Sequence, residues 1–511
     1  MSFAPQSPQS SYRSQPPQSS QLRQFSQYLA SAGSLWRHVL AGALSVVAAV
    51  LAMATTAWVA LAVLGAGTVA PVSRLVPALV SMAVRGGVSV ESAASTSGGG
   101  LLGGLRGGGL SVGLAGDVAV TPLTLTFVGT VVLGVVFFRP LHRSSGTAPV
   151  TLWARCGGAS VAAAVVFPIL AAFAHGTARL PENVTQRFRE GASGGAFSRF
   201  SGGGGGSAAQ LSSVSFATDG VATGFLGLLW VSVVLGVGCV VARRTTLPYP
   251  HTLGRLRLKW NAVTSTLTGI AAVLCCAAVA VALLAGAAAL TGREQAAKAA
   301  GLLLLVGPNL IAVLLTSGLG TSWEAGVHRL RPSGGVFGMF GSGGQGGTTG
   351  ADRSVNLGDW AGAGIPLWVI GLLLVLLLLV SAGFVVAART PVRTPKEDSD
   401  SLLDRHAEIG VRLGIAVGVL VLVLPLLARG SLRIGISLMG VEVGGLTAGL
   451  DGSPGLPALA GSVLATLAGY GGSRLWSRWV RRRGRAARLP GAEPRPPARS
   501  SSSQVPSDSA L

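Results

Sequence analysis

Charged residues are scarce in this chain of 511 residues. Asp, Glu, Lys and Arg make up 11% of the sequence, against roughly 25% in soluble domains. A soluble protein of this length needs far more charge to cover its surface, so the composition excludes that class. Uncharged apolar runs longer than about 18 residues recur along the chain, which excludes disorder throughout. The sequence therefore predicts an all-α, polytopic helical membrane protein.

Lysine is nearly absent, because only Lys259, Lys298 and Lys396 stand beside a large excess of Arg. Arg, Ala, Gly and Val have GC-rich codons, so the bias indicates a high-GC bacterium. A net charge of +21 is compatible with nucleic-acid binding. In a membrane protein, however, Lys and Arg first set the topology, so we expect no nucleic-acid partner.

Residue patterns that carry chemistry are also missing. The four cysteines lie in apolar stretches without a CxxC pair, and no two of the six histidines lie three or four residues apart. No HExxH, GxSxG or phosphate-loop motif occurs. All 18 acidic residues fall in tails, loops or span ends, whereas ion-coupled carriers usually keep ionisable groups at mid-membrane. We predict no catalytic, cofactor or metal site, and a protein that is not an enzyme.

Long apolar runs are what the sequence has in abundance. Eight of them are predicted to cross the membrane: 39–66, 118–138, 156–174, 220–242, 261–291, 364–388, 411–428 and 454–473. A ninth run, 301–320, carries Gly-Pro-Asn at 307–309. Proline interrupts the helical hydrogen-bond ladder, so we expect 301–320 to be a broken or re-entrant helix rather than a crossing.

The distribution of basic residues supports eight crossings. With both termini inside, 25 of the 39 Lys and Arg residues lie on the inner side, as the positive-inside rule requires. If 301–320 does cross, a further span is needed near 434–450, giving nine or ten helices in all. That alternative moves the basic segment 389–412 outside, so we disfavour it. We expect a multi-pass plasma-membrane protein with both termini cytoplasmic.

Two polar tails flank the membrane domain, which we assign to 36–480. Residues 1–35 are rich in Ser, Gln and Pro and are predicted to form a disordered cytoplasmic tail. Residues 481–511 are first basic and then rich in Pro and Ser, and are predicted to form a second cytoplasmic tail. The apolar run after residue 35 is too long for a cleaved signal peptide, so we expect an uncleaved anchor.

The four outer loops end in a recurring pattern, which predicts four helix–loop–helix repeats. It reads S-V-G-L at 111–114, S-V-S-F at 213–216, S-V-N-L at 354–357 and, more loosely, V-E-V at 441–443. Such alternating segments are compatible with short extended pieces. One aspartate then precedes each return helix: Asp117, Asp219, Asp359 and Asp451.

The four aspartates have two interpretations. As N-caps, their carboxylates accept backbone N–H groups and oppose the helix dipole. As a ring of carboxylates, they hold a cation or a cationic substrate at the outer face. The spacing fits a cap at every position, so we favour caps.

These loop-end motifs, the Gly-Pro-Asn-Leu at 307–310 and the following Gly318-Leu319-Gly320 resemble the streptophobe family over roughly 36–480. These are very hydrophobic membrane proteins of Streptomyces and related actinomycetes. A group of actinobacterial multi-span proteins, sometimes labelled cell-division membrane proteins, has a similar Pro-Asn broken helix. The resemblance implies an actinomycete membrane protein and brings no catalytic residue with it.

Two further patterns concern packing and the membrane surface. Gly410, Gly414 and Gly418 repeat every four residues and predict a close-packing helix face. The run from Arg474 to Arg483 mixes Trp476 and Trp479 with arginines, which is typical of a membrane interface in contact with anionic lipid headgroups.

Two functions remain open from the sequence. The first is a non-enzymatic envelope protein that organises partners, which fits the polar tails, long outer loops and missing catalytic groups. The second is a permease or lipid-handling transporter, which fits the repeats and the proline-containing run.

Overall fold

The computed structural model describes residues 18–92, 112–143, 149–179, 213–242, 253–289, 294–330, 353–356, 361–362, 365–390, 404–438 and 441–486. The α-helices are α1 (Gln18–Leu64), α2 (Val72–Ala83), α4 (Leu123–Arg143), α5 (Pro149–Phe173), α9 (Gly220–Val241), α10 (Leu253–Ala289), α11 (Glu294–Gly318), α13 (Leu367–Arg389), α15 (Arg405–Ala428) and α16 (Gly455–Ala486). The strands are β1 (Val88–Ser92), β2 (Val112–Val120), β3 (Gly176–Arg179), β4 (Ser213–Thr218), β5 (Trp323–Leu330), β6 (Arg353–Asn356), β7 (Ala361–Gly362), β8 (Ile365–Pro366), β9 (Gly430–Leu438) and β10 (Val441–Gly452).

The prediction of a polytopic helical protein is confirmed. Eight helices in the described ranges are long and apolar enough to cross a membrane: α1, α4, α5, α9, α10, α11, α13 and α15. This set differs from the predicted spans in two helices. It includes α11, which holds the run 301–320, and it omits α16, which holds the predicted span 454–473.

An eight-stranded antiparallel sheet accompanies the helices. Its strand order is β3-β4-β1-β2-β9-β10-β5-β6. Each loop-end pattern overlaps one of its strands, namely β2, β4, β6 or β10. The short extended pieces were foreseen, but their union in one sheet was not, because pairing between distant loops leaves no local signal in the sequence.

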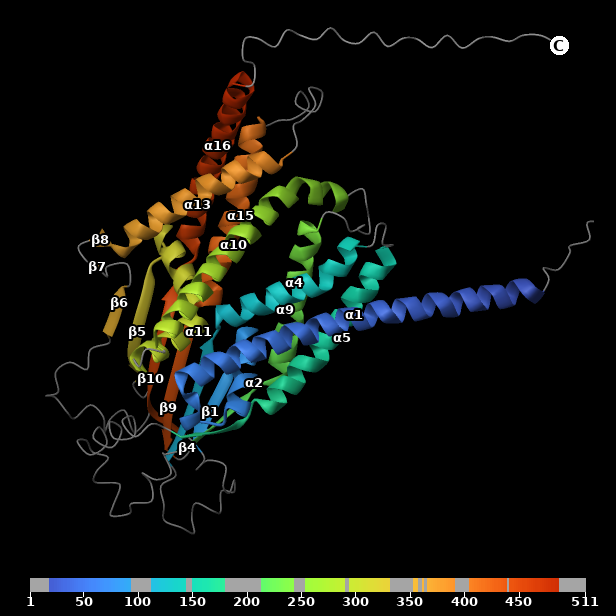
Figure 1. Cartoon of the computed structure of the whole chain (residues 1–511). Helices are drawn as coiled ribbons and strands as arrows, with labels where there is room; N and C mark the ends of the chain where they lie inside the picture. Colours follow the sequence, from blue (N-terminus) through green and yellow to red (C-terminus); the bar gives the residue numbers. More distant parts are fainter. Residues whose placement is uncertain are drawn as a thin grey trace, which may run out of the picture.

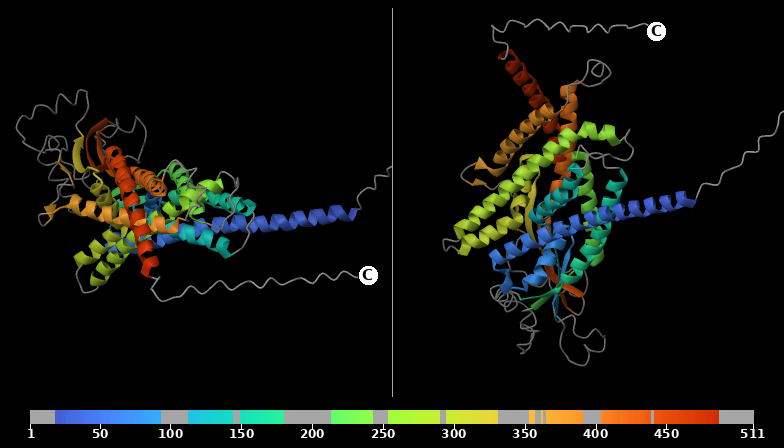
Figure 2. Two further views of the ribbon diagram at one scale, coloured as in Figure 1. Left: turned by 90° about the horizontal axis from the view of Figure 1, so that it is seen from above. Right: turned by 45° about the vertical axis from the view of Figure 1, so that its right-hand side comes forward.

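The sheet lies at one end of the helix bundle. Figure 1 and the right-hand view of Figure 2 show the strands at the lower end, with α1 leaving to the right and α16 rising at the top. The ends of α4, α9 and α13 and the starts of α5, α10 and α15 lie at the opposite end, which we call the tail end (Figure 1). The chain therefore passes through the bundle eight times if α10 and α11 together make one pass.

The chain consists of two similar halves. The first half contributes the strand pairs β1–β2 and β3–β4, and the second contributes β5–β6 and β9–β10. In both halves the later pair lies on the same side of the earlier one, so β4 joins β1 as β10 joins β5. The predicted four repeats are thus arranged as two tandem units, and α11 takes the place in the second half that α2 takes in the first.

The ends of α2 and α11 repeat each other in detail. The backbone N–H groups of Val84 and Gly86 both donate to the Ser81 carbonyl, and those of Leu319 and Thr321 both donate to the Thr316 carbonyl. The residue before the last donor has a positive φ in both places, 70° at Arg85 and 91° at Gly320. Strand β1 or β5 begins seven residues after Ser81 or Thr316. This shared turn aims the chain from a short helix into the sheet.

Helix α11 lies along the sheet-end termini of its neighbours. A Cβ on Gly301 would meet Leu64 at the end of α1, and one on Gly318 would meet Gly371 near the start of α13. Between them, the Leu305 carbonyl accepts a hydrogen bond from Thr124 at the start of α4. A helix that crossed the bundle would meet its neighbours at different depths. Its contacts therefore agree with the prediction that 301–320 does not cross.

The predicted break at 307–309 is wrong, because α11 is continuous through Pro308. Proline removes one backbone donor from the ladder, yet helices tolerate this where neighbouring side chains supply hydrogen bonds. The carbonyl that loses its donor is that of Leu304, four residues before Pro308. Next to it, Thr124 Oγ1 donates to the Leu305 carbonyl at 3.1 Å, and the Asn309 side chain bonds to the start of α4. The turn around Pro308 is held from outside and keeps its helical path.

The described helices also reach into both predicted tails. Helix α1 begins at Gln18, inside the segment 1–35, and α16 continues to Ala486, inside the segment 481–511. Residues 1–17 and 487–511 lie outside the described ranges.

The glycine face of α15 is a helix-packing face, as predicted. A Cβ on Gly410 would come within 2.6 Å of the Thr466 carbonyl, and one on Gly414 would collide with the Thr466 hydroxyl. Gly418 meets Ser462 at 3.0 Å. Small residues allow the two backbones to approach closely, which brings α15 and α16 together along their length.

The sheet is buried on one face. Ala78 of α2 forms an apolar cluster with Val88 of β1 and Phe216 of β4. On the other face, Ser89 and Arg433 flank Asp117 in register, and all three are exposed. This alternation is typical of an antiparallel sheet with one solvated face.

Candidate anion-binding site

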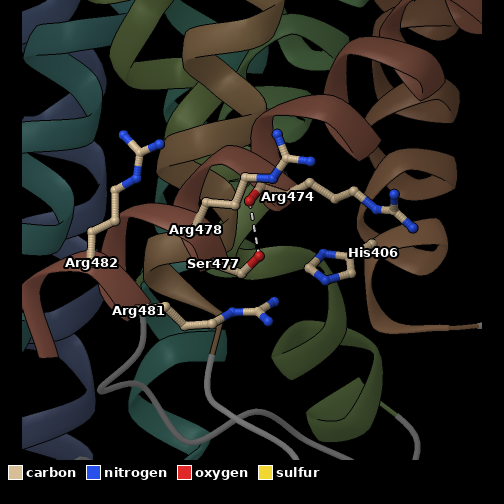
Figure 3. Close-up of a pocket in the computed structure, with 6 residues that line it drawn as sticks. All are labelled: His406, Arg474, Ser477, Arg478, Arg481 and Arg482. Atoms are coloured by element: carbon tan, nitrogen blue, oxygen red, sulfur yellow. Dashed lines mark hydrogen bonds between the residues drawn. The ribbon is translucent and has the colours of Figure 1, made fainter. Parts of the chain in front are cut away.

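A basic hollow lies at the tail end of the bundle, between the start of α15 and the last turns of α16. It has a volume of about 530 Å³. Figure 3 shows the side chains that line it: His406, Arg474, Ser477, Arg478, Arg481 and Arg482. The lining residues thus include four arginines and one histidine and no carboxylate.

Helical geometry explains why these arginines gather. Residues three and four apart lie on one face of a helix, so Arg474, Arg478 and Arg481 form one stripe along α16. The stripe faces His406 because the glycines of α15 bring the two helices together. The sequence predicted a basic interface over 474–483. In the structure, some of its arginines line this hollow, and its tryptophans lie on another side of α16.

His406 is fixed within the hollow by a hydrogen-bond chain. Its Nδ1 lies 2.8 Å from the hydroxyl of Ser473, a residue that is 1% exposed. That hydroxyl donates its hydrogen to the Tyr470 carbonyl at 2.8 Å. Because a hydroxyl has only one hydrogen to give, Nδ1 of His406 is the donor to Ser473. Its Nε2 is therefore the nitrogen left for a ligand.

Aromatic rings occupy the other side of α16. Trp476 and Trp479 stack with centroids 5.1 Å apart, and Phe384 of α13 meets Trp476 edge-on at 5.1 Å. Arg483 lies over the Trp479 ring at 3.9 Å. Tryptophans beside arginines at the end of a span are typical of a membrane–water interface.

The sequence did not single out His406 as a site residue. It lies 67 residues from Ser473 and 68 from Arg474 along the chain, so no local spacing connects them. The arginine stripe itself was visible, but a surface belt and one wall of a hollow have the same sequence pattern.

The predicted N-cap is confirmed at Asp219. Its Oδ1 accepts hydrogen bonds from the backbone N–H groups of Val221 at 2.9 Å and Ala222 at 3.3 Å, at the start of α9. Asp359 lies outside the described residues.

The cap prediction is wrong for Asp117 and Asp451, which lie within strands β2 and β10. Asp117 is in register with Arg433, and Asp451 forms an ion pair with Arg429 at 3.0 Å. Strands β2 and β10 continue to Val120 and Gly452, so each aspartate falls before the helix start that it was expected to cap.

The described aspartates do not form a carboxylate ring. Asp117 and Asp451 are separated by strand β9 and by four positions in register, or about 16 Å at ordinary sheet spacings. Asp219 directly follows the end of β4. Strand β4 is separated from β2, which holds Asp117, by β1, on the side of β2 that faces away from β10. In the described part of the chain, no group of three or more His, Cys, Asp or Glu residues could hold a metal ion.

Asn309 is a buried polar residue with an assigned structural role. It is 6% exposed, and its Oδ1 accepts from the Leu123 N–H at 3.0 Å while its Nδ2 donates to the Thr121 carbonyl at 2.8 Å. The side chain from α11 thus caps the start of α4, where Pro122 follows the end of β2. The sequence marked this asparagine only as part of a break.

A second, smaller hollow of about 140 Å³ lies where the sheet meets the helices. It is lined by Met82, Arg85, Gly86, Ala119, Val120, Thr121, Arg429 and Ser431. Neither hollow lies in the middle of the bundle.

Comparison with protein-family models, with curated proteins and with solved structures finds no match. The apolar helices and the strand pairing of this chain make it a multi-pass membrane protein with a sheet at one end.

Proposed function

We propose that this protein is a non-enzymatic scaffold of the plasma membrane that presents its sheet on the outer side and organises partners there. Both termini are cytoplasmic in this proposal, because the tail end carries most of the Lys and Arg residues. Membership of the streptophobe family belongs to the same proposal and is supported by the loop-end and Gly-Pro-Asn-Leu motifs.

The observation that carries the proposal is the polar face of the sheet. Strands from both halves of the chain join at β2 and β9 over nine residue pairs, which makes one continuous surface from four separate loops. Ser89, Asp117 and Arg433 lie side by side across it and are exposed. A surface built in this way has no role in helix packing and is available to a partner.

Photo-crosslinking in intact cells tests this function. A photoreactive amino acid at Ser89 should give discrete protein adducts, whereas the same group at Leu229, exposed on a predicted span, should not. The charge reversal Asp117→Arg should remove the adducts at Ser89 without lowering the amount of protein in the membrane. Absence of adducts at Ser89, or adducts insensitive to Asp117→Arg, contradicts the proposal.

The alternative is a permease or lipid-handling transporter, and the two tandem halves favour it. Many transporters are built from two such halves related by an axis along the membrane normal. Uptake or lipid transfer by purified protein in proteoliposomes tests this alternative. Activity there, with no partner captured at the sheet, favours the transporter.

A further inference from the structure

We propose that the hollow between α15 and α16 is a binding site for the headgroup of an anionic phospholipid with two phosphates. This inference refines the expected contact with anionic lipid to one site and one headgroup class. It rests on the proposed membrane interface at the tail end and does not depend on the scaffold function.

The hollow is lined by positive charge. Arg474, Arg478, Arg481 and Arg482 line one hollow, and guanidinium groups bind phosphate oxygens through paired hydrogen bonds. A single phosphodiester carries one negative charge and leaves most of these cations uncompensated. A headgroup with two phosphates matches the hollow better, and basic pockets between helices on the cytoplasmic side typically bind such headgroups.

Hydrogen bonds orient the histidine in the hollow. Nδ1 of His406 donates to Ser473, so the ring is oriented before any ligand arrives, and Nε2 donates to a phosphate oxygen when the ring is an imidazolium. The Ser477 hydroxyl donates its one hydrogen to the Arg474 carbonyl at 2.9 Å (Figure 3), so the donors for an anion come from the arginines and the histidine. Cationic side chains and an oriented imidazole together form a preorganised anion site.

The surroundings of the hollow favour a lipid as the source of the phosphate. The hollow adjoins Trp476 and Trp479 on the same helix, and the apolar Leu475 and Val480 are 48% and 45% exposed. Exposed apolar side chains beside stacked tryptophans mark the level of the bilayer surface. A lipid can place its chains against these residues while its headgroup enters the hollow, whereas a soluble phosphate gains nothing from them.

Equilibrium binding to the purified full chain in a neutral detergent tests the site. The probes are cardiolipin with two phosphates, phosphatidylglycerol at twice the concentration with one, and inorganic pyrophosphate without acyl chains. We expect cardiolipin to bind more tightly than either of the others. Equal binding of phosphatidylglycerol overturns the two-phosphate site, and equal binding of pyrophosphate overturns the lipid as its occupant.

Matched arginine variants locate the site. A basic residue near a membrane surface contributes about 1 kcal/mol to attraction of anionic lipid, or roughly fivefold in affinity. Arg483→Gln should weaken cardiolipin binding by no more than this, because Arg483 lies over Trp479 and is not one of the lining residues. Arg478→Gln should weaken it more than tenfold. Equal losses in the two variants mean general surface attraction and overturn the site.

The variant Ser473→Ala tests the role of His406 without changing the charge of the hollow. It leaves every arginine in place and removes the hydroxyl that orients His406, so cardiolipin affinity should fall while phosphatidylglycerol affinity stays unchanged. Unchanged cardiolipin affinity overturns the role of His406. Thermal unfolding of each variant checks that it is folded. These binding assays probe only the hollow in purified protein. A negative result would therefore refute the lipid site and would not affect the scaffold proposal, which the crosslinking experiment tests separately.

Discussion

Asn309 shows how one buried side chain joins two parts of the chain. We expect Asn309→Leu to leave the Leu123 N–H and the Thr121 carbonyl without their partner. An unsatisfied buried polar group costs about 1–3 kcal/mol, so the variant should unfold at a clearly lower temperature. Leu310→Ala serves as the control, because Leu310 is the next residue and is 52% exposed. Equal melting temperatures for wild type and Asn309→Leu contradict the clamp.

Substitutions of Asp219 distinguish an N-cap from a carboxylate that binds a cation. Asp219→Asn keeps an oxygen acceptor for the Val221 N–H and should change stability little, whereas Asp219→Ala should lower it by about 0.5–2 kcal/mol. Thermal unfolding with and without divalent cations measures both variants. A cation-dependent gain in the wild type that disappears in Asp219→Asn would show that the carboxylate binds a cation.

At the scale of elements, backbone proximity decides which glycines matter. We expect Gly414→Ala to destabilise the protein by about 1–3 kcal/mol, because the added methyl group collides with the Thr466 hydroxyl and lies 2.6 Å from the Ser462 carbonyl. Gly236 on α9 has nothing within 4 Å of an added Cβ, so Gly236→Ala should be neutral or stabilising. Chemical denaturation of both variants in detergent provides the comparison.

Cysteine labelling can show whether both ends of helix α11 lie on the same side of the membrane. We expect both Gln295 and Ser322 to lie on the outer side, because α11 runs along the sheet end and does not cross. Single cysteines at these exposed positions, in a chain without its four native cysteines, should react with an impermeant maleimide in intact cells.

A cysteine in place of Asp404, exposed before α15, is the control for the inner side and should react only after permeabilisation. If Gln295→Cys behaves like Asp404→Cys, then α11 crosses the membrane.

At the scale of the whole molecule, eight passes place both ends of the chain on one side. Reporter fusions after residues 20 and 490 should therefore both report the cytoplasm. The expectation rests on 25 of 39 basic residues lying on that side. A periplasmic signal from either fusion refutes the topology.

The sequence predicted the helices well because their signal is local. Each predicted span overlaps one long helix, although the first residues of 118–138 lie in strand β2. What it missed depends on distant partners. Asn309 bonds to Leu123 across 186 positions, and Arg433 lies opposite Asp117 although the two belong to different halves. Composition and periodicity carry no information about such pairs.

Likewise, the two copies of the turn, Ser81–Gly86 and Thr316–Thr321, have no identical residue at any aligned position. Its backbone hydrogen bonds repeat, but Arg85 takes the positive φ in one copy and Gly320 in the other. The correspondence between α2 and α11 is therefore evident from the backbone geometry and cannot be detected in the amino-acid sequence.

The junction between β2 and β9 sets an order of events during synthesis. Val120 and Gly430 pair across 310 positions, which a ribosome takes roughly 15–60 s to translate. Throughout that interval β2 is the last strand of a half-finished sheet, and an open strand edge invites wrong partners. The nascent chain consequently needs protection at this edge after its first four passes are inserted, and completion of the final hairpin is the step that removes the hazard.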